Sequence, residues 1–254
     1  LLYIVYCKIK YPEIVKYQLI RRWHDYKEIF NFAAWSGYGT VAWVGKAQGA
    51  NLLINYFFGA TLNAALGVAN SVNGILVTFA GNVGSAITPQ ITKSYAADNI
   101  IRTESLVIAN SKFTFLLMLI PAVPVLLETE FLMNLWLVNV PQYTVNFIRL
   151  MLIDSLVVAL YAGVTNAVFA SGKIKLYQFI VSTISLLSLP VAFVFLKLGY
   201  EPNALFYSYI GVSVVSLIVR QIMANNILHF DTKRFLVNLY IPAILVFISL
   251  LPLS

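Results

Sequence analysis

Three ionisable residues, Lys46, Arg149 and Asp154, stand inside long apolar stretches of the chain. At the centre of a helix in a lipid bilayer, a charged side chain costs about 2.5–3.5 kcal/mol on insertion scales, so each should face protein or water. Asp154 lies deeper than Arg149 and is best suited to bind a proton or a monovalent cation. Lys46 either extends to the membrane surface or pairs with a carboxylate on a helix outside this chain, and Arg149 also suits the outer interface.

Carboxamide side chains follow Lys46 closely in the sequence. Gln48, Asn51 and Asn55 fall on one face of a helix, because successive residues are 100° apart. Lys46 points nearly opposite to these amides, on the side of two glycines. The stretch therefore presents a polar face and a separate, single cation.

A second polar stripe lies in the next apolar stretch, where small and polar residues recur every three or four positions. Its members are Asn63, Gly67, Asn70, Gly74, Thr78, Gly81 and Ser85. Such a stripe is unsuited to lipid. It indicates either close packing of two helices through small residues or the wall of a water-filled cavity, and the residues favour neither alternative.

The residues that enzymes need are scarce. His24 and His229 have no ligand cluster nearby, and Cys7 is the only cysteine, which argues against a zinc site and a disulfide framework. The sequence contains neither a phosphate-binding glycine loop ending in Lys-Ser/Thr nor an aspartate-rich metal motif. We therefore expect a non-enzymatic protein without a cofactor, apart from coupling to Na⁺ or H⁺.

The composition places these residues in a membrane. Hydrophobic residues make up 60% of the 254 residues and charged residues 11%, whereas about a quarter of the residues of a soluble domain are charged. The mean hydropathy is +0.81. The apolar stretches lack the alternation of membrane β-strands, so the expected fold is an all-α, polytopic helical bundle.

About seven stretches have the length of roughly 20 residues that a membrane-spanning helix needs. We place them near 30–57, 62–90, 106–127, 145–170, 177–197, 204–226 and 235–253. Prolines at positions 121, 124, 190 and 242 should break or kink the third, fifth and seventh of these helices. Residues of a broken helix can line a transport cavity.

Basic residues set the expected orientation. Most of the 17 lysines and arginines precede the first span or follow the second, fourth and sixth, where they share one face of the membrane. By the positive-inside rule this face is cytoplasmic. Arg220, at the edge of the sixth span, belongs to this set. The net charge of +7 is thus a topology signal, and its partners are lipid headgroups rather than nucleic acid.

Two segments resemble a known transporter family. Phe57-Phe58-Gly59-Ala60-Thr61-Leu62-Asn63-Ala64-Ala65 and Thr88-Pro89-Gln90-Ile91-Thr92-Lys93-Ser94-Tyr95 are similar to the polysaccharide-flippase branch of the MATE-like superfamily, of Bacteroides type. In that branch a span opens on Gly-x-x-Asn-Ala-Ala and closes on Asn-Pro-Gln-Ile-x-Lys-x-Tyr. Thr88 departs from the usual Asn. The upstream segment from Lys46 to Asn51 resembles the family as well.

The resemblance implies two six-helix lobes around a cavity that opens alternately to each side of the bacterial inner membrane. This chain would be the C-terminal half, with its partner lobe outside it. Residues 1–29 would be the end of an earlier helix and a basic cytoplasmic connector, 30–226 the lobe, and 227–254 an additional membrane helix.

The resemblance also implies a cargo and roles for the singled-out residues. The flippases move undecaprenyl-diphosphate-linked oligosaccharides to the outer leaflet. Lys46 and Arg149 would then offset the charge of the diphosphate, and Asp154 would couple transport to an ion. Hydrogen bonds to sugar or phosphate would come from Gln48, Asn51, Asn55, Asn63 and Asn70. The alternatives are a cation-coupled multidrug exporter, which needs more acidic cavity residues, and a membrane scaffold without transport activity.

Overall fold

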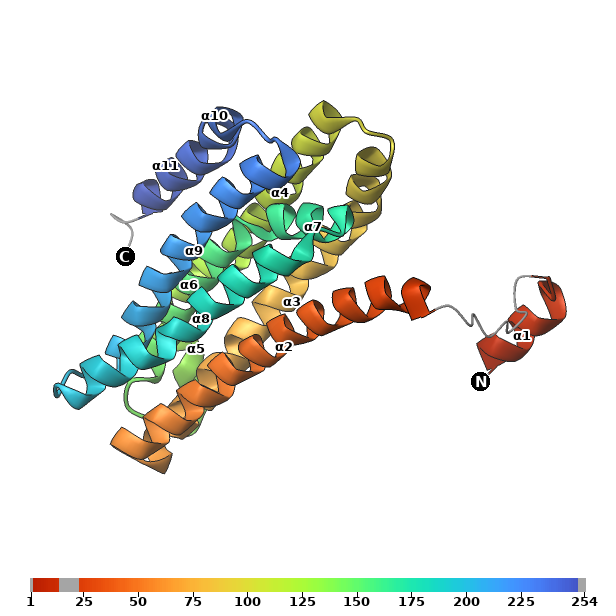
Figure 1. Ribbon diagram of the computed structural model, residues 1–254. Helices are drawn as coiled ribbons and strands as arrows, with labels where there is room; N and C mark the ends of the chain where they lie inside the picture. Colours follow the sequence, from red (N-terminus) through yellow and green to blue (C-terminus); the bar gives the residue numbers. More distant parts are fainter. Residues whose placement is uncertain (1, 14–22, 251–254) are drawn as a thin grey trace.

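The computed structural model describes residues 2–13 and 23–250, and every regular element within these ranges is a helix (Figure 1). The expected all-α class is therefore confirmed. The elements are α1 (Leu2–Lys10), α2 (Trp23–Phe58), α3 (Ala60–Ala96), α4 (Ile100–Leu127), α5 (Thr129–Trp136), α6 (Thr144–Ala159), α7 (Ala162–Ser171), α8 (Ile174–Lys197), α9 (Ala204–Leu228), α10 (Thr232–Phe235), the π-helix η1 (Leu236–Tyr240) and α11 (Ile241–Leu250).

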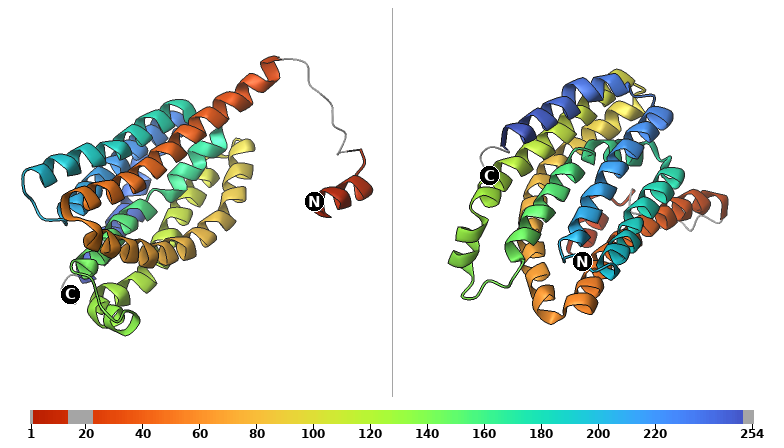
Figure 2. Two further views of the ribbon diagram at one scale, coloured as in Figure 1. Left: turned by 90° about the horizontal axis from the view of Figure 1, so that it is seen from below. Right: turned by 90° about the vertical axis from the view of Figure 1, so that its left-hand side faces the viewer.

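The long helices run up and down, so that their connections gather at two ends of the bundle (Figures 1 and 2). The α2–α3 and α8–α9 turns lie at one end, and the α3–α4 and α7–α8 turns at the other. Gly59 makes the sharp α2–α3 turn with a φ of 83°, a conformation that glycine adopts without steric cost. The basic residues near the α3–α4 and α7–α8 turns consequently share one end, as the expected topology requires.

Among residues 2–13 and 23–250, four helices are long and apolar enough to cross a membrane: α3, α4, α8 and α9. The bent pair α6 and α7 makes a fifth if it counts as one span. The expected number of about seven is not confirmed. Helix α2 covers the first expected span but carries Lys46 and several amides, and residues 235–250 are divided among α10, η1 and α11; residues 251–253 lie outside the described part.

The break in the bundle lies at a position that the prolines did not predict. Helix α4 continues through Pro121 and Pro124, and α8 through Pro190. The break falls instead between α6 and α7, which meet at 43° around Leu160 and Tyr161. Just after the break, Gly163 packs on α4 and donates its backbone N–H to Ser111 Oγ at 3.0 Å, so a tertiary contact stabilises the bent arrangement.

The buried apolar residues form two clusters, one in each half of the bundle. One cluster includes Phe147, Leu152 and Phe206, and the other includes Tyr177, Phe230 and Phe235. Buried polar residues lie between these clusters along α4, α8 and α9, and together with Asp154 of α6 we call them the polar layer. Its members are Asn110, Ser111 and Thr114 of α4, Asp154 of α6, Ser182 and Ser188 of α8, and Ser213, Ser216 and Arg220 of α9.

The C-terminal elements are fixed to α4 by an ion pair near the basic end of the bundle. Arg234 Nη1 lies 2.6 Å from Glu104 Oε2, and the other carboxylate oxygen accepts the backbone N–H of Asp231 at 2.7 Å. Glu104 is buried, whereas Arg234 remains partly exposed. Both oxygens of the buried carboxylate are therefore satisfied, as burial of a charge requires.

The close approach of α7 to α4 gives a stability prediction. A Cβ atom on Gly163 would lie 2.3 Å from the carbonyl oxygen of Val107, so Gly163→Ala should lower the unfolding free energy by about 1–3 kcal/mol. Gly74→Ala is the control, because a Cβ there meets nothing within 4 Å and alanine has the higher helix propensity. Unfolding in detergent measures both. Equal stability of the two variants would contradict the close contact.

Candidate functional site

Lys46 of α2 pairs with Asp154 of α6 inside the bundle. The ammonium lies 3.8 Å from Asp154 Oδ2 and 4.0 Å from the ring centre of Tyr209. The side chains of Lys46 and Asp154 are 19% and 12% exposed. The expected alternatives for Lys46 were extension to the membrane surface or a carboxylate outside this chain; both are wrong, because Asp154 of the same chain supplies the charge.

Helix α9 presents one polar stripe to the rest of the bundle. Tyr209, Ser213, Ser216 and Arg220 follow one another at intervals of four, three and four residues, which keeps them on one helix face. We call these four residues the α9 seam. Tyr209 Oη donates to the backbone carbonyl of Lys46 at 3.0 Å, and Ser213 Oγ donates to Asp154 Oδ1 at 2.5 Å.

Arg220 forms the other end of the seam. Its Nη1 donates to Thr165 Oγ1 at 2.8 Å and to Tyr177 Oη at 2.6 Å, and its Nε donates to Ser216 Oγ at 3.1 Å. The guanidinium carbon lies 4.2 Å from the ring centre of Tyr161. Arg220 is buried, and no carboxylate in residues 2–13 or 23–250 lies within ion-pair distance of it. Hydroxyl groups and an aromatic face thus replace a counter-ion.

The assignment of Arg220 to the surface basic residues was wrong. Its position near the end of α9 resembles a topology signal, but the side chain turns into the bundle. The available signal was the polar periodicity of the α9 seam, which places Arg220 on the same face as Ser213. The partners of this seam on α6 and α7 are Asp154, Tyr161 and Thr165.

The amides singled out from the sequence lie elsewhere. Gln48 and Asn55 are exposed, and Asn51 is half-buried and donates to Gln48 Oε1 at 3.4 Å. On α3, Asn70 is exposed and Asn63 half-buried. None of these amides contacts the Lys46–Asp154 pair through a described hydrogen bond.

The glycines of the α3 stripe have no neighbours in the bundle. A Cβ on Gly67, Gly74 or Gly81 would meet nothing within 4 Å, and Thr78 and Ser85 are exposed. Close packing of this stripe on the described helices is therefore excluded. In contrast, α2 packs tightly on α8 through Gly39 and Gly49, where a Cβ would overlap Gln178 and Leu189.

Arg149 does not join Lys46. Its Nε donates to Thr129 Oγ1 of α5 at 3.4 Å, in the N-terminal half of α6. It is half-buried there. The expected cationic pair of Lys46 and Arg149 is thus not assembled, and the buried cation of the polar layer is Arg220.

Two residues of the polar layer have unsatisfied polar atoms. Neither Asn110 Oδ1 nor Nδ2 has a hydrogen-bond partner in the described chain, although the side chain is fully buried, and the same holds for Thr114 Oγ1. Both oxygens lie against Gly84 of α3, whose Cβ would meet them at 3.1–3.3 Å.

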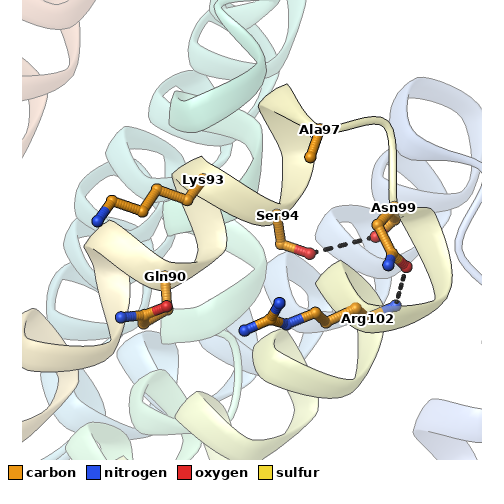
Figure 3. Close-up of a pocket in the computed structure, with 6 residues that line it drawn as sticks. All are labelled: Gln90, Lys93, Ser94, Ala97, Asn99 and Arg102. Atoms are coloured by element: carbon orange, nitrogen blue, oxygen red, sulfur yellow. Dashed lines mark hydrogen bonds between the residues drawn. The ribbon is translucent and has the colours of Figure 1, made fainter.

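A polar hollow of about 160 Å³ lies at the basic end of the bundle, remote in the fold from Lys46 and Asp154. Figure 3 shows its lining residues on the end of α3 and the start of α4. They are Gln90, Lys93, Ser94, Ala97, Asn99 and Arg102. Asn99 accepts the backbone N–H of Arg102, and Ser94 donates to the carbonyl of Asn99, so the turn is held from within. Gln90, Lys93 and Ser94 belong to the second segment of the family resemblance.

The comparisons with known proteins identify no relative. No protein-family model matches the chain, and neither a curated protein nor a solved structure matches it.

The Lys46–Asp154 pair gives a second prediction. Asp154→Asn leaves the Lys46 ammonium without its counter-charge inside the bundle, so it should lower the unfolding free energy by about 3–5 kcal/mol. Adding Lys46→Met to Asp154→Asn should restore most of this loss, because the unpaired charge is removed. Unfolding in detergent measures the variants.

Asp98→Asn is the matched control for this prediction. Asp98 is an exposed carboxylate in the α3–α4 turn, and its replacement should change stability by no more than about 0.5 kcal/mol. If Asp154→Asn proves as stable as Asp98→Asn, the ion pair does not hold the bundle together.

Proposed function

We propose that the chain is part of a membrane transporter that flips undecaprenyl-diphosphate-linked oligosaccharides across the bacterial inner membrane by alternating access. The observation that carries the proposal is the exposed polar face of α3. A helix that crosses a membrane and is mostly unburied in its own bundle would normally present apolar side chains to lipid. Asn70, Gly74, Thr78 and Gly81 present a polar surface instead. A water-filled cavity is the surrounding that suits it.

The amides of α2 extend this polar surface. Gln48, Asn51 and Asn55 point away from the ion pair, on the helix that joins α3 at Gly59. Carboxamides both donate and accept hydrogen bonds, as recognition of sugar hydroxyls requires. In the proposed transporter, they line the cavity between this bundle and a second lobe.

The charge of the polar layer favours an anionic cargo. Lys46 and Asp154 cancel each other, and Arg220 leaves one positive charge without a carboxylate among the described residues. A diphosphate that leaves water is stabilised by such an excess of positive charge, whereas a cationic drug is repelled. The multidrug exporter, which needs an excess of carboxylates, is therefore the second candidate.

The family resemblance supplies the direction of transport and the carrier lipid. Asp154 would couple transport to Na⁺ or H⁺, since binding of either at its carboxylate competes with Lys46. Release of the Lys46 ammonium would then accompany ion binding. This role needs no group beyond Lys46, Asp154 and Ser213.

Thiol accessibility tests the cavity. In a Cys7→Ser background, single cysteines at Asn70 and Thr78 should react with a membrane-impermeant thiol reagent in intact membranes. A cysteine at Phe79 is the control, because Phe79 is exposed on the apolar side of the same helix and should react only with a permeant reagent. Protection of positions 70 and 78 to the level of position 79 would contradict a water-filled cavity.

Complementation tests the cargo. Expressed in a bacterium that lacks its own O-antigen flippase, the full-length protein should restore surface polysaccharide. Lys46→Ala should abolish restoration without loss of membrane insertion, because Asp154 loses its internal counter-charge. Lys197→Ala is the matched control, because Lys197 is an exposed lysine at the C-terminal end of α8. Drug resistance without surface polysaccharide would favour the multidrug exporter.

A further inference from the structure

The broken span α6–α7 runs parallel to α9, and the two polar faces keep the same register on both sides of the break. Asp154 and Tyr161 are seven residues apart on the broken span, and Ser213 and Arg220 are seven apart on α9. Ser213 contacts Asp154, and the Arg220 guanidinium covers the Tyr161 ring. Helix α9 therefore contacts α6 at Asp154 and the break itself at Tyr161.

Arg220 also reaches past the break to both neighbouring helices. Through Nη1 it joins Thr165 of α7 to Tyr177 of α8, and these two hydroxyls lie 3.0 Å from each other. Hydrogen bonds to a charged group contribute about 1.5–3 kcal/mol each, more than those between neutral groups. This node joins α7 to α8 and α9, and a further side-chain hydrogen bond of α7 runs to α3, where Asn166 Nδ2 donates to Thr88 Oγ1 at 3.1 Å.

On the α4 side, a single described hydrogen bond marks the start of α7. Ser111 accepts the Gly163 N–H, one residue after α7 begins. This contact is at the near end of α7 and can act as a pivot, whereas Thr165 lies two residues further along. The arrangement is that of a short helix with a pivot on α4, a neutral hydrogen bond to α3 through Asn166, and a charged restraint on α9.

We propose that Arg220 is the positioning residue that sets the angle of α7, and that its release lets α7 turn about the Ser111–Gly163 contact. The guanidinium has only neutral partners in the described chain, so its hold on α7 is reversible without separation of an ion pair. The movement would open or close the end of the bundle where α7 joins α8. This movement of α7 does not depend on the identity of a cargo.

A distance measurement tests the proposal. Spin labels on Lys173, just beyond α7, and on Asn226, near the end of α9, report the position of α7 in the full chain; both residues are exposed. Straightening the 43° bend of the ten-residue α7 would move its far end by roughly 10 Å at a rise of 1.5 Å per residue. A second pair on Thr92 and Ser105, across the α3–α4 turn, should not change.

Arg220→Met keeps the length of the side chain but removes its charge and donors, so the Lys173–Asn226 distance should broaden and shift. Arg220→Lys should shift it less, because an ammonium keeps the charge but lacks the fork that reaches Thr165 and Tyr177 together. Ser216→Ala is the control. It removes an acceptor on α9 itself, leaves the contacts with α7 and α8 and should leave the distance unchanged.

Thr165→Val combined with Tyr177→Phe provides an independent variant, because it removes both Nη1 acceptors and retains Arg220. It should shift the Lys173–Asn226 distance in the same direction as Arg220→Met. If Arg220→Met does not insert into the membrane, this double variant alone tests the proposal. The proposal would be overturned if Arg220→Met and the Thr165→Val/Tyr177→Phe double variant, where each inserts into the membrane, both showed the wild-type distance distribution. An equal shift in Ser216→Ala would also overturn it.

Discussion

A charge buried inside a helical bundle must be compensated within the protein, and this requirement organises the bundle. Lys46 finds a carboxylate on α6, and Arg220 finds hydroxyl groups on α7, α8 and α9. Each solution draws together helices that are distant in the sequence. The apolar clusters then fill the two halves of the bundle on either side of the polar layer.

Sequence periodicity predicted which way side chains point but not what they meet. The spacing of Lys46 relative to Gln48 and Asn51 correctly placed the cation and the amides on different faces of α2. The partner of Lys46 lies more than a hundred residues away, and only the topology brings it near. Arg220 was misassigned because a basic residue close to a helix end has the same local sequence whether it faces water or the core.

Helix breaks show the same limit. The prolines at 121, 124 and 190 lie within continuous helices, while the break at Leu160 and Tyr161 has no proline beside it. The contact of Gly163 with α4 lies beside this break, and such a tertiary contact cannot be read from the local sequence. Glycines likewise divide by their surroundings. Gly39 and Gly49 allow two helices to approach, whereas Gly67 and Gly74 contribute only to an exposed polar surface.

The matched seven-residue steps of the α9 seam and the broken span limit how this region can change length. One residue inserted between Ser213 and Arg220 would turn the guanidinium by about 100° around α9, away from Tyr161, while Ser213 kept its place beside Asp154. A deletion would turn it equally far in the opposite direction. Substitutions at the outward positions of this interval are therefore compatible with the seam, but insertions and deletions are not.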